Sequence, residues 1–108
     1  LAHFDAYLAK SVTGPLAAAA RAGRVRALAR LDRAGAVLFA AADYLALYPR
    51  GRAAAEMHRR RGDVFAGRGD CGLAAREYRI VLERWAGSPE AERARAGLAA
   101  CAAGFTAE

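Results

Sequence analysis

The residue types that perform acid–base or nucleophilic chemistry are few and scattered in this 108-residue chain. Its two histidines, His3 and His58, belong to no recognisable nucleophile motif. The acidic residues are spread over predicted helix surfaces and are not paired at the spacing of a general acid and a general base. The sequence therefore predicts a protein that is not an enzyme and that carries no cofactor.

The two cysteines allow two interpretations. Cys71 and Cys101 lack the CxxC spacing and the nearby histidine pair of a zinc site, so no metal site is predicted. Cys71 opens one predicted helix, and Cys101 lies late in the next, which should run antiparallel beside it. A disulfide between them would indicate an oxidising compartment such as the periplasm. The alternative is a pair of small buried thiols in an alanine-rich interior.

The densest charge cluster is the run His58-Arg59-Arg60-Arg61. With a net charge of +6, the chain should attract polyanions, acidic protein segments or a negatively charged membrane surface. Four consecutive helical residues spread around the whole circumference, however, so only part of the run can face one partner. No stacking aromatic residues or glycine-rich arms accompany it. Nucleic-acid binding is therefore the alternative function, and a compositional bias toward arginine explains the charge equally well.

Helices are the elements that must position these residues. The high alanine content and only three prolines favour an all-α fold. No stretch of about 20 uncharged apolar residues is present, so no membrane span is predicted. A partial N-terminal helix over 1–10 should carry Phe4, Tyr7 and Leu8 on one face. Five full helices are predicted at about 15–31, 34–48, 52–67, 72–85 and 89–103.

An internal repeat of 37 residues relates these helices to one another. The letters AYLA at residues 6–9 return as DYLA at residues 43–46, and Gly14 recurs as Gly51. A fixed period of this size is typical of a helical solenoid, in which stacked helix pairs build a binding surface. The single predicted domain divides into a half-repeat (1–13), two repeats (14–50 and 51–87) and a terminal helix (88–108).

The segment 55–85 carries the pattern of small and large residues of a known family. It resembles a tetratricopeptide repeat through residues spaced as that family requires: Gly62, Phe65, Gly69, Asp70, Ala74, Tyr78 and Val81. The preceding unit places Val25, Leu28, Val37, Ala41 and Tyr44 in the corresponding positions. It departs from the pattern at Val25, where the family prefers glycine, and at Asp32, where the next unit has Gly69.

The resemblance implies a right-handed solenoid of antiparallel helix pairs that binds a partner in a concave groove. The period is longer than the usual 34 residues, and in this respect the chain is similar to periplasmic and other envelope tetratricopeptide proteins of bacteria. These parallels imply an adaptor or scaffold in an envelope complex, with the cytoplasm as the alternative location. The chain is expected to be a fragment of a longer protein, and its open ends could self-associate.

Carried over residue by residue, the groove would be lined by Arg26, Arg30, Glu56, Arg59, Asp63 and Arg93. The balance is basic, and arginine binds carboxylates through two parallel hydrogen bonds. The expected partner is therefore a protein or peptide with acidic side chains or a free C-terminal carboxylate. The best-known peptide-clamping members use Lys and Asn at several of these positions, and this chain does not. A solvated arginine face without a ligand is the competing interpretation.

Overall fold

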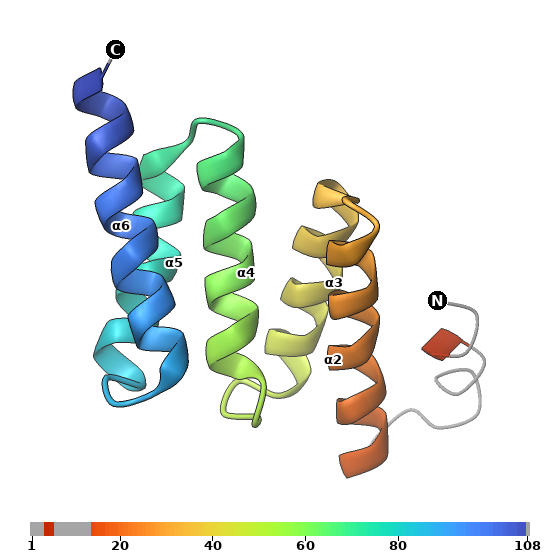
Figure 1. The fold of residues 1–108 in the computed structure, drawn as a ribbon. Coiled ribbons are helices and arrows are strands. Elements are labelled where there is room, and N and C mark those ends of the chain that lie inside the picture. The colour runs from red at the N-terminus through yellow and green to blue at the C-terminus, as the bar shows by residue number, and fades with distance from the viewer. Residues whose placement is uncertain (1–3, 6–13, 108) are drawn as a thin grey trace. The chain divides into compact units, whose positions relative to one another are not determined.

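The computed structural model describes residues 4–5 and 14–107, and it is all-α within them, as predicted (Figure 1). Each helix begins within two residues of its predicted start. The first four end at the predicted residue or one residue before it, and the last runs four residues beyond the prediction. Phe4 and Asp5 are helical, whereas Tyr7, Leu8 and the rest of the predicted partial helix lie outside the described residues. The helices are α2 (Pro15–Arg30), α3 (Ala34–Leu47), α4 (Ala54–Gly67), α5 (Cys71–Arg84) and α6 (Pro89–Ala107).

The chain divides into two compact units, Leu1–Met57 and His58–Glu108. In the first unit α2 packs on α3, and in the second α5 packs on α6 (Figure 1). Helix α4 begins in the first unit and ends in the second. Each unit has a core of its own, because both contain fully buried side chains from more than one helix.

The first unit is built on small side chains around one tyrosine. Alanines supply much of the buried surface of α2 and α3, and Tyr44 is the largest fully buried side chain. The Tyr44 hydroxyl accepts a hydrogen bond from the Ala53 N–H at 3.1 Å. A Cβ at Gly51 would overlap this hydroxyl, so glycine is needed where the chain leaves α3 for α4. The buried phenol is thereby satisfied without a second polar side chain.

The second unit is organised around Tyr78, which lies between two glycines. A Cβ at Gly62 would approach the Tyr78 ring to 2.6 Å, and one at Gly97 would overlap the ring from α6. Helices α4 and α6 therefore approach Tyr78 closely, because the two glycines lack side chains. Ser88 caps α6, as predicted: its Oγ accepts a hydrogen bond from the Ala91 N–H at 3.2 Å.

The turn between α2 and α3 and the turn between α4 and α5 have matching backbone geometry. Asp32 ends the turn after α2 with φ +59°, and Gly69, 37 residues later, has φ +80°. In each turn, the N–H of the residue after the left-handed position donates to the carbonyl five residues earlier. Arg33 bonds the Leu28 carbonyl at 3.1 Å, and Asp70 bonds the Phe65 carbonyl at 2.9 Å. Both turns are thus Schellman-type ends, and only the residue in the left-handed position differs.

The junctions that follow each helix pair match as well. The Gly51 N–H donates to the Tyr48 carbonyl at 3.0 Å, and the Ser88 N–H donates to the Trp85 carbonyl at 3.0 Å. At each junction, an N–H group at the start of the next helix also donates to the carbonyl of the residue three positions earlier. The 37-residue period of the sequence is therefore also a period of the backbone.

Phe4 extends this correspondence to the N-terminal residues. A Cβ at Gly23 would meet the Phe4 ring at 2.5 Å, which is the relation that Gly97 has to Tyr78. In each pair the glycine follows the aromatic residue by 19 positions, and the two pairs are two 37-residue periods apart. Phe4 thus packs on α2 as Tyr78 packs on α6.

Candidate functional site

The residues predicted to bind a partner lie on three helices and in both units. Helix α2 carries Arg26 and Arg30, and α6 carries Arg93. Helix α4 carries Glu56 in the first unit, and Arg59 and Asp63 in the second. Three of the four arginines form ion pairs with carboxylates of their own unit.

In the first unit, Arg26 and Glu56 form a two-point ion pair. Arg26 Nη2 donates to Glu56 Oε1 at 2.6 Å, and Nε donates to Oε2 at 2.9 Å. Both parallel bonds of the Arg26 guanidinium therefore go to one carboxylate. The Arg26 side chain remains 42% exposed. Arg30 is exposed near the end of α2.

In the second unit, five side chains from three helices form one hydrogen-bonded group, which we call the Arg59 cluster: Arg59, Asp63, Tyr78, Glu90 and Arg93. Arg59 donates from Nε to Glu90 at 2.9 Å and from Nη1 to Asp63 at 2.8 Å. The Tyr78 hydroxyl donates to the other Asp63 oxygen at 2.7 Å. Arg93 donates from Nη1 to Glu90 at 2.9 Å. Two arginines and two carboxylates balance within the cluster.

The two arginines of the Arg59 cluster differ in accessibility. The Arg59 side chain is only 12% exposed, whereas that of Arg93 is 62% exposed. A molecule in solution can therefore reach the Arg93 guanidinium, whereas that of Arg59 is largely covered. The sequence predicted both arginines to line the groove, and it did not predict their different exposure.

Two pKa values in the Arg59 cluster are shifted by their surroundings. Burial alone would lower the pKa of Arg59, but its bonds to Glu90 and Asp63 outweigh burial and raise it. Burial raises the pKa of Tyr78, and the hydrogen bond to Asp63 and the charge of Asp63 raise it further. Both groups are protonated at neutral pH in any case, and the raised pKa values mean that they keep their protons to a higher pH.

Sequence reasoning missed Glu90, which joins Arg59 to Arg93. One signal was available, because Glu90 stands three residues before Arg93 in the first turn of α6, a spacing that predicts an ion pair. The bond to Arg59 spans 31 residues and joins different helices. Only the packing of the helices could reveal it.

The basic run His58–Arg61 is divided among different contacts. His58 Nδ1 donates to Glu77 Oε1 at 2.9 Å, and Arg61 lies 3.5 Å from the same oxygen. Arg61 also lies over the Phe65 ring, 5.8 Å from its centroid. Glu77 is 9% exposed and is held by these two side chains. Much of the run therefore serves the interior of the unit, which lends the nucleic-acid alternative no support.

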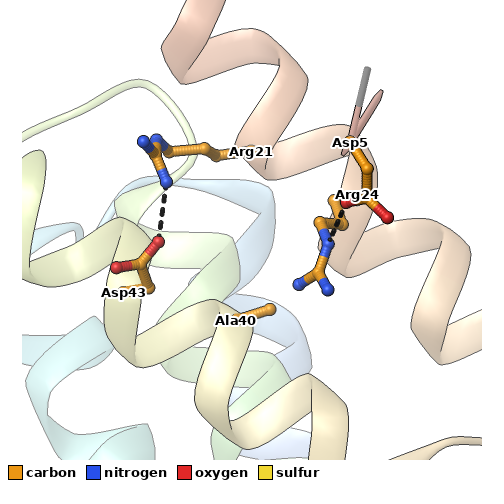
Figure 2. Close-up of a pocket in the computed structure, with 5 residues that line it drawn as sticks. All are labelled: Asp5, Arg21, Arg24, Ala40 and Asp43. Atoms are coloured by element: carbon orange, nitrogen blue, oxygen red, sulfur yellow. Dashed lines mark hydrogen bonds and ion pairs between the residues drawn. The ribbon is translucent and has the colours of Figure 1, made fainter. Parts of the chain in front are cut away.

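A cavity of about 240 Å³ lies in the first unit (Figure 2). It is lined by Asp5, Arg21, Arg24, Ala40 and Asp43. Figure 2 shows Arg21 bonded to Asp43 and Arg24 bonded to Asp5. The nitrogen–oxygen distance is 2.8 Å in each pair. The two positive and two negative charges balance, so the cavity has no net preference for an anion. Within residues 4–5 and 14–107, no cluster of three or more potential metal ligands is found there or elsewhere.

Cys71 and Cys101 form a disulfide, with their Cα atoms 5.7 Å apart. Of the two interpretations that the sequence left open, the structure contains the bonded form. Both residues are half-buried. The bond links the start of α5 to α6.

Comparison with known proteins found no matching family model, no matching curated protein and no matching solved structure. Among the described helices, none is both long and apolar enough to cross a membrane.

Proposed function

We propose that this chain is a tetratricopeptide-like repeat module that binds another protein and performs no catalysis. The observation that carries the proposal is the recurrence of backbone geometry at 37 residues, in the turns at Asp32 and Gly69 and in the junctions that follow. Repeated helix pairs of this kind stack into a right-handed solenoid whose surface receives a partner segment. In this proposal the module is an adaptor or scaffold.

The partner's carboxylate binds at Arg93. This side chain is exposed and bonds Glu90 through Nη1, which leaves Nε and Nη2 to donate to a second carboxylate. Arg59 positions Glu90 and is too covered to contact the partner itself. Asp63 is half-exposed beside this group and would reject an anion on its side, which sets the register of the bound segment.

We further propose that the module works in an oxidising compartment, the bacterial periplasm or envelope, rather than in the cytoplasm. The Cys71–Cys101 disulfide supports this location, because such bonds persist where thiols are not kept reduced. Self-association through open ends of the solenoid belongs to the same proposal.

Peptide binding to Arg93→Glu and Arg95→Glu variants tests the partner site. Arg95 is a matched control: it is 53% exposed and bonds the carboxylate three residues before it, as Arg93 does. Two residues along a helix turn the side chain by about 200°, so Arg95 points to another side of α6. The probe is a fluorescent peptide of four glutamates with a free C-terminus, followed by anisotropy at low salt.

We expect Arg93→Glu to weaken binding by about tenfold or more and Arg95→Glu by less than about twofold, and we expect added salt to weaken binding to the wild type. Equal losses in the two variants would show that only overall charge attracts the peptide. Absence of binding to the wild type would refute the proposed ligand class.

A further inference from the structure

The anchoring of α6 changes along its length. Its first half is held by the Ser88 cap, by the ion pair between Glu90 and Arg59, and by the fully buried Ala91 and Ala94. After Leu98 the contacts change character: among residues 99–104, Cys101 has the only side chain that is not exposed. Over residues 99–104, the disulfide is therefore placed where burial of apolar surface contributes little to holding the helix.

The position of Cys71 makes the bond open to exchange. Cys71 is the first residue of α5, directly after its N-cap Asp70. A thiolate at this position lies at the positive end of the α5 dipole, which stabilises its charge, while the Asp70 side chain accepts the Leu73 N–H in the same turn. Both cysteines are half-buried, so a small dithiol or the active site of a dithiol protein can reach the bond.

We propose that the Cys71–Cys101 disulfide is a redox latch for the C-terminal half of α6. When the bond is formed, this half of the helix is held on α5. When a dithiol reduces the bond, the residues after Leu98 detach while the rest of the second unit stays folded. The inference stands on α5 and α6 alone and does not require the proposed partner site.

The exchange proceeds in two steps that balance. A thiolate of the dithiol attacks Cys101 Sγ, the bond to Cys71 breaks, and Cys71 leaves as the stabilised thiolate. The second thiol of the reductant then loses its proton and attacks the mixed disulfide. Cys101 leaves as a thiolate and takes up a proton, and the reductant becomes a disulfide.

Hydrogen exchange of the oxidised and dithiothreitol-reduced protein tests the latch. We expect amides of residues 99–107 to exchange about tenfold faster after reduction, and those of α5 and of residues 91–95 to change less than about twofold. The Cys71→Ser, Cys101→Ser double variant should behave as the reduced protein with or without dithiothreitol. Unchanged exchange at residues 99–107 would overturn the proposal. Equal acceleration throughout the second unit would also overturn it, since the bond would then stabilise the whole unit.

The order of attack has its own test in the single variants. Cys101→Ser leaves Cys71 free, and Cys71→Ser leaves Cys101 free. We expect iodoacetamide to alkylate Cys71 at least about fivefold faster than Cys101 at pH 7, with each protein unfolded in urea as the control for intrinsic reactivity. Equal or reversed rates in the folded proteins would refute Cys71 as the leaving group.

Discussion

At the scale of single residues, Tyr78 links the packing of the second unit to its polar cluster. Its ring fills the space left by Gly62 and Gly97, and its hydroxyl donates to Asp63, which also accepts from Arg59. Ionising this hydroxyl would place a phenolate against a carboxylate. The folded state therefore holds the Tyr78 proton more tightly than the unfolded state does.

The raised pKa of Tyr78 predicts a loss of stability in alkaline solution. The folded pKa of Tyr78 lies above the unfolded value of 10.0. The stabilisation that the protonated hydroxyl gives to the folded state is therefore fully present below pH 10, and it is lost as the pH rises through the folded pKa. We expect the free energy of unfolding, measured by urea denaturation, to fall progressively as the pH is raised above about 10. Tyr78→Phe should be less stable at pH 8 by about 1 kcal/mol and should lose much of this alkaline decline. A decline of equal size in Tyr78→Phe would assign it to other groups.

Replacing Glu90 should separate stability from affinity. Glu90→Gln removes the carboxylate that neutralises both Arg59 and Arg93. Because Arg59 is nearly buried and keeps only Asp63 as its charged partner, we expect the free energy of unfolding to fall by about 2 kcal/mol. Arg93 is freed at the same time, so the acidic peptide should bind about threefold to tenfold more tightly.

The comparison with Glu92→Gln controls for the change in net charge. Glu92 occupies the same helix turn and pairs with Arg95 instead. It should change both quantities little. Weaker peptide binding to Glu90→Gln than to the wild type would contradict the assignment of Arg93 as the contact residue.

At the scale of elements, the two turns offer a matched pair of substitutions. Gly69 has φ +80°, and a Cβ there would meet no atom within 4 Å, so Gly69→Ala tests the backbone conformation alone. We expect it to lower the free energy of unfolding by about 1 kcal/mol. Asp32 occupies the equivalent position with φ +59°, so Asp32→Gly should be neutral or stabilise by up to about 1 kcal/mol. Urea denaturation of both variants measures this, and no loss in Gly69→Ala would argue against the shared turn.

The helix boundaries could be predicted because their signals are local. Pro15 and Pro89 mark helix starts, Ser88 caps the helix after it, and Gly69 marks a turn. The partners of the arginines could not be predicted in this way. The bonds from Arg26 to Glu56 and from Arg59 to Glu90 span 30 and 31 residues and depend on helix packing. The sequence therefore indicated a basic surface where the structure has balanced ion pairs.

At the scale of the whole molecule, the 37-residue unit is the basis of the account. It explains why Tyr48 and Trp85 end α3 and α5 with the same cap bond, at 2.7 and 2.8 Å, and why Phe4 and Tyr78 face glycines at one spacing. Chains built from such units gain stability from each neighbour, so a unit can be added without redesigning the rest. The charges at the predicted groove positions differ between the units. In the proposed function, this difference would select the partner.

The most direct test is to insert a second copy of residues 51–87 between Gly87 and Ser88, with Cys71→Ser in the upstream copy so that one disulfide remains. Gly51 and Ser88 occupy the same place in the repeat, so the new junction preserves the backbone pattern. We expect a protein with the oligomeric state of the wild type, whose ellipticity per residue at 222 nm is unchanged and whose urea transition stays cooperative with a larger m-value. A lower ellipticity per residue, or a separate transition for the inserted copy, would contradict a 37-residue structural repeat.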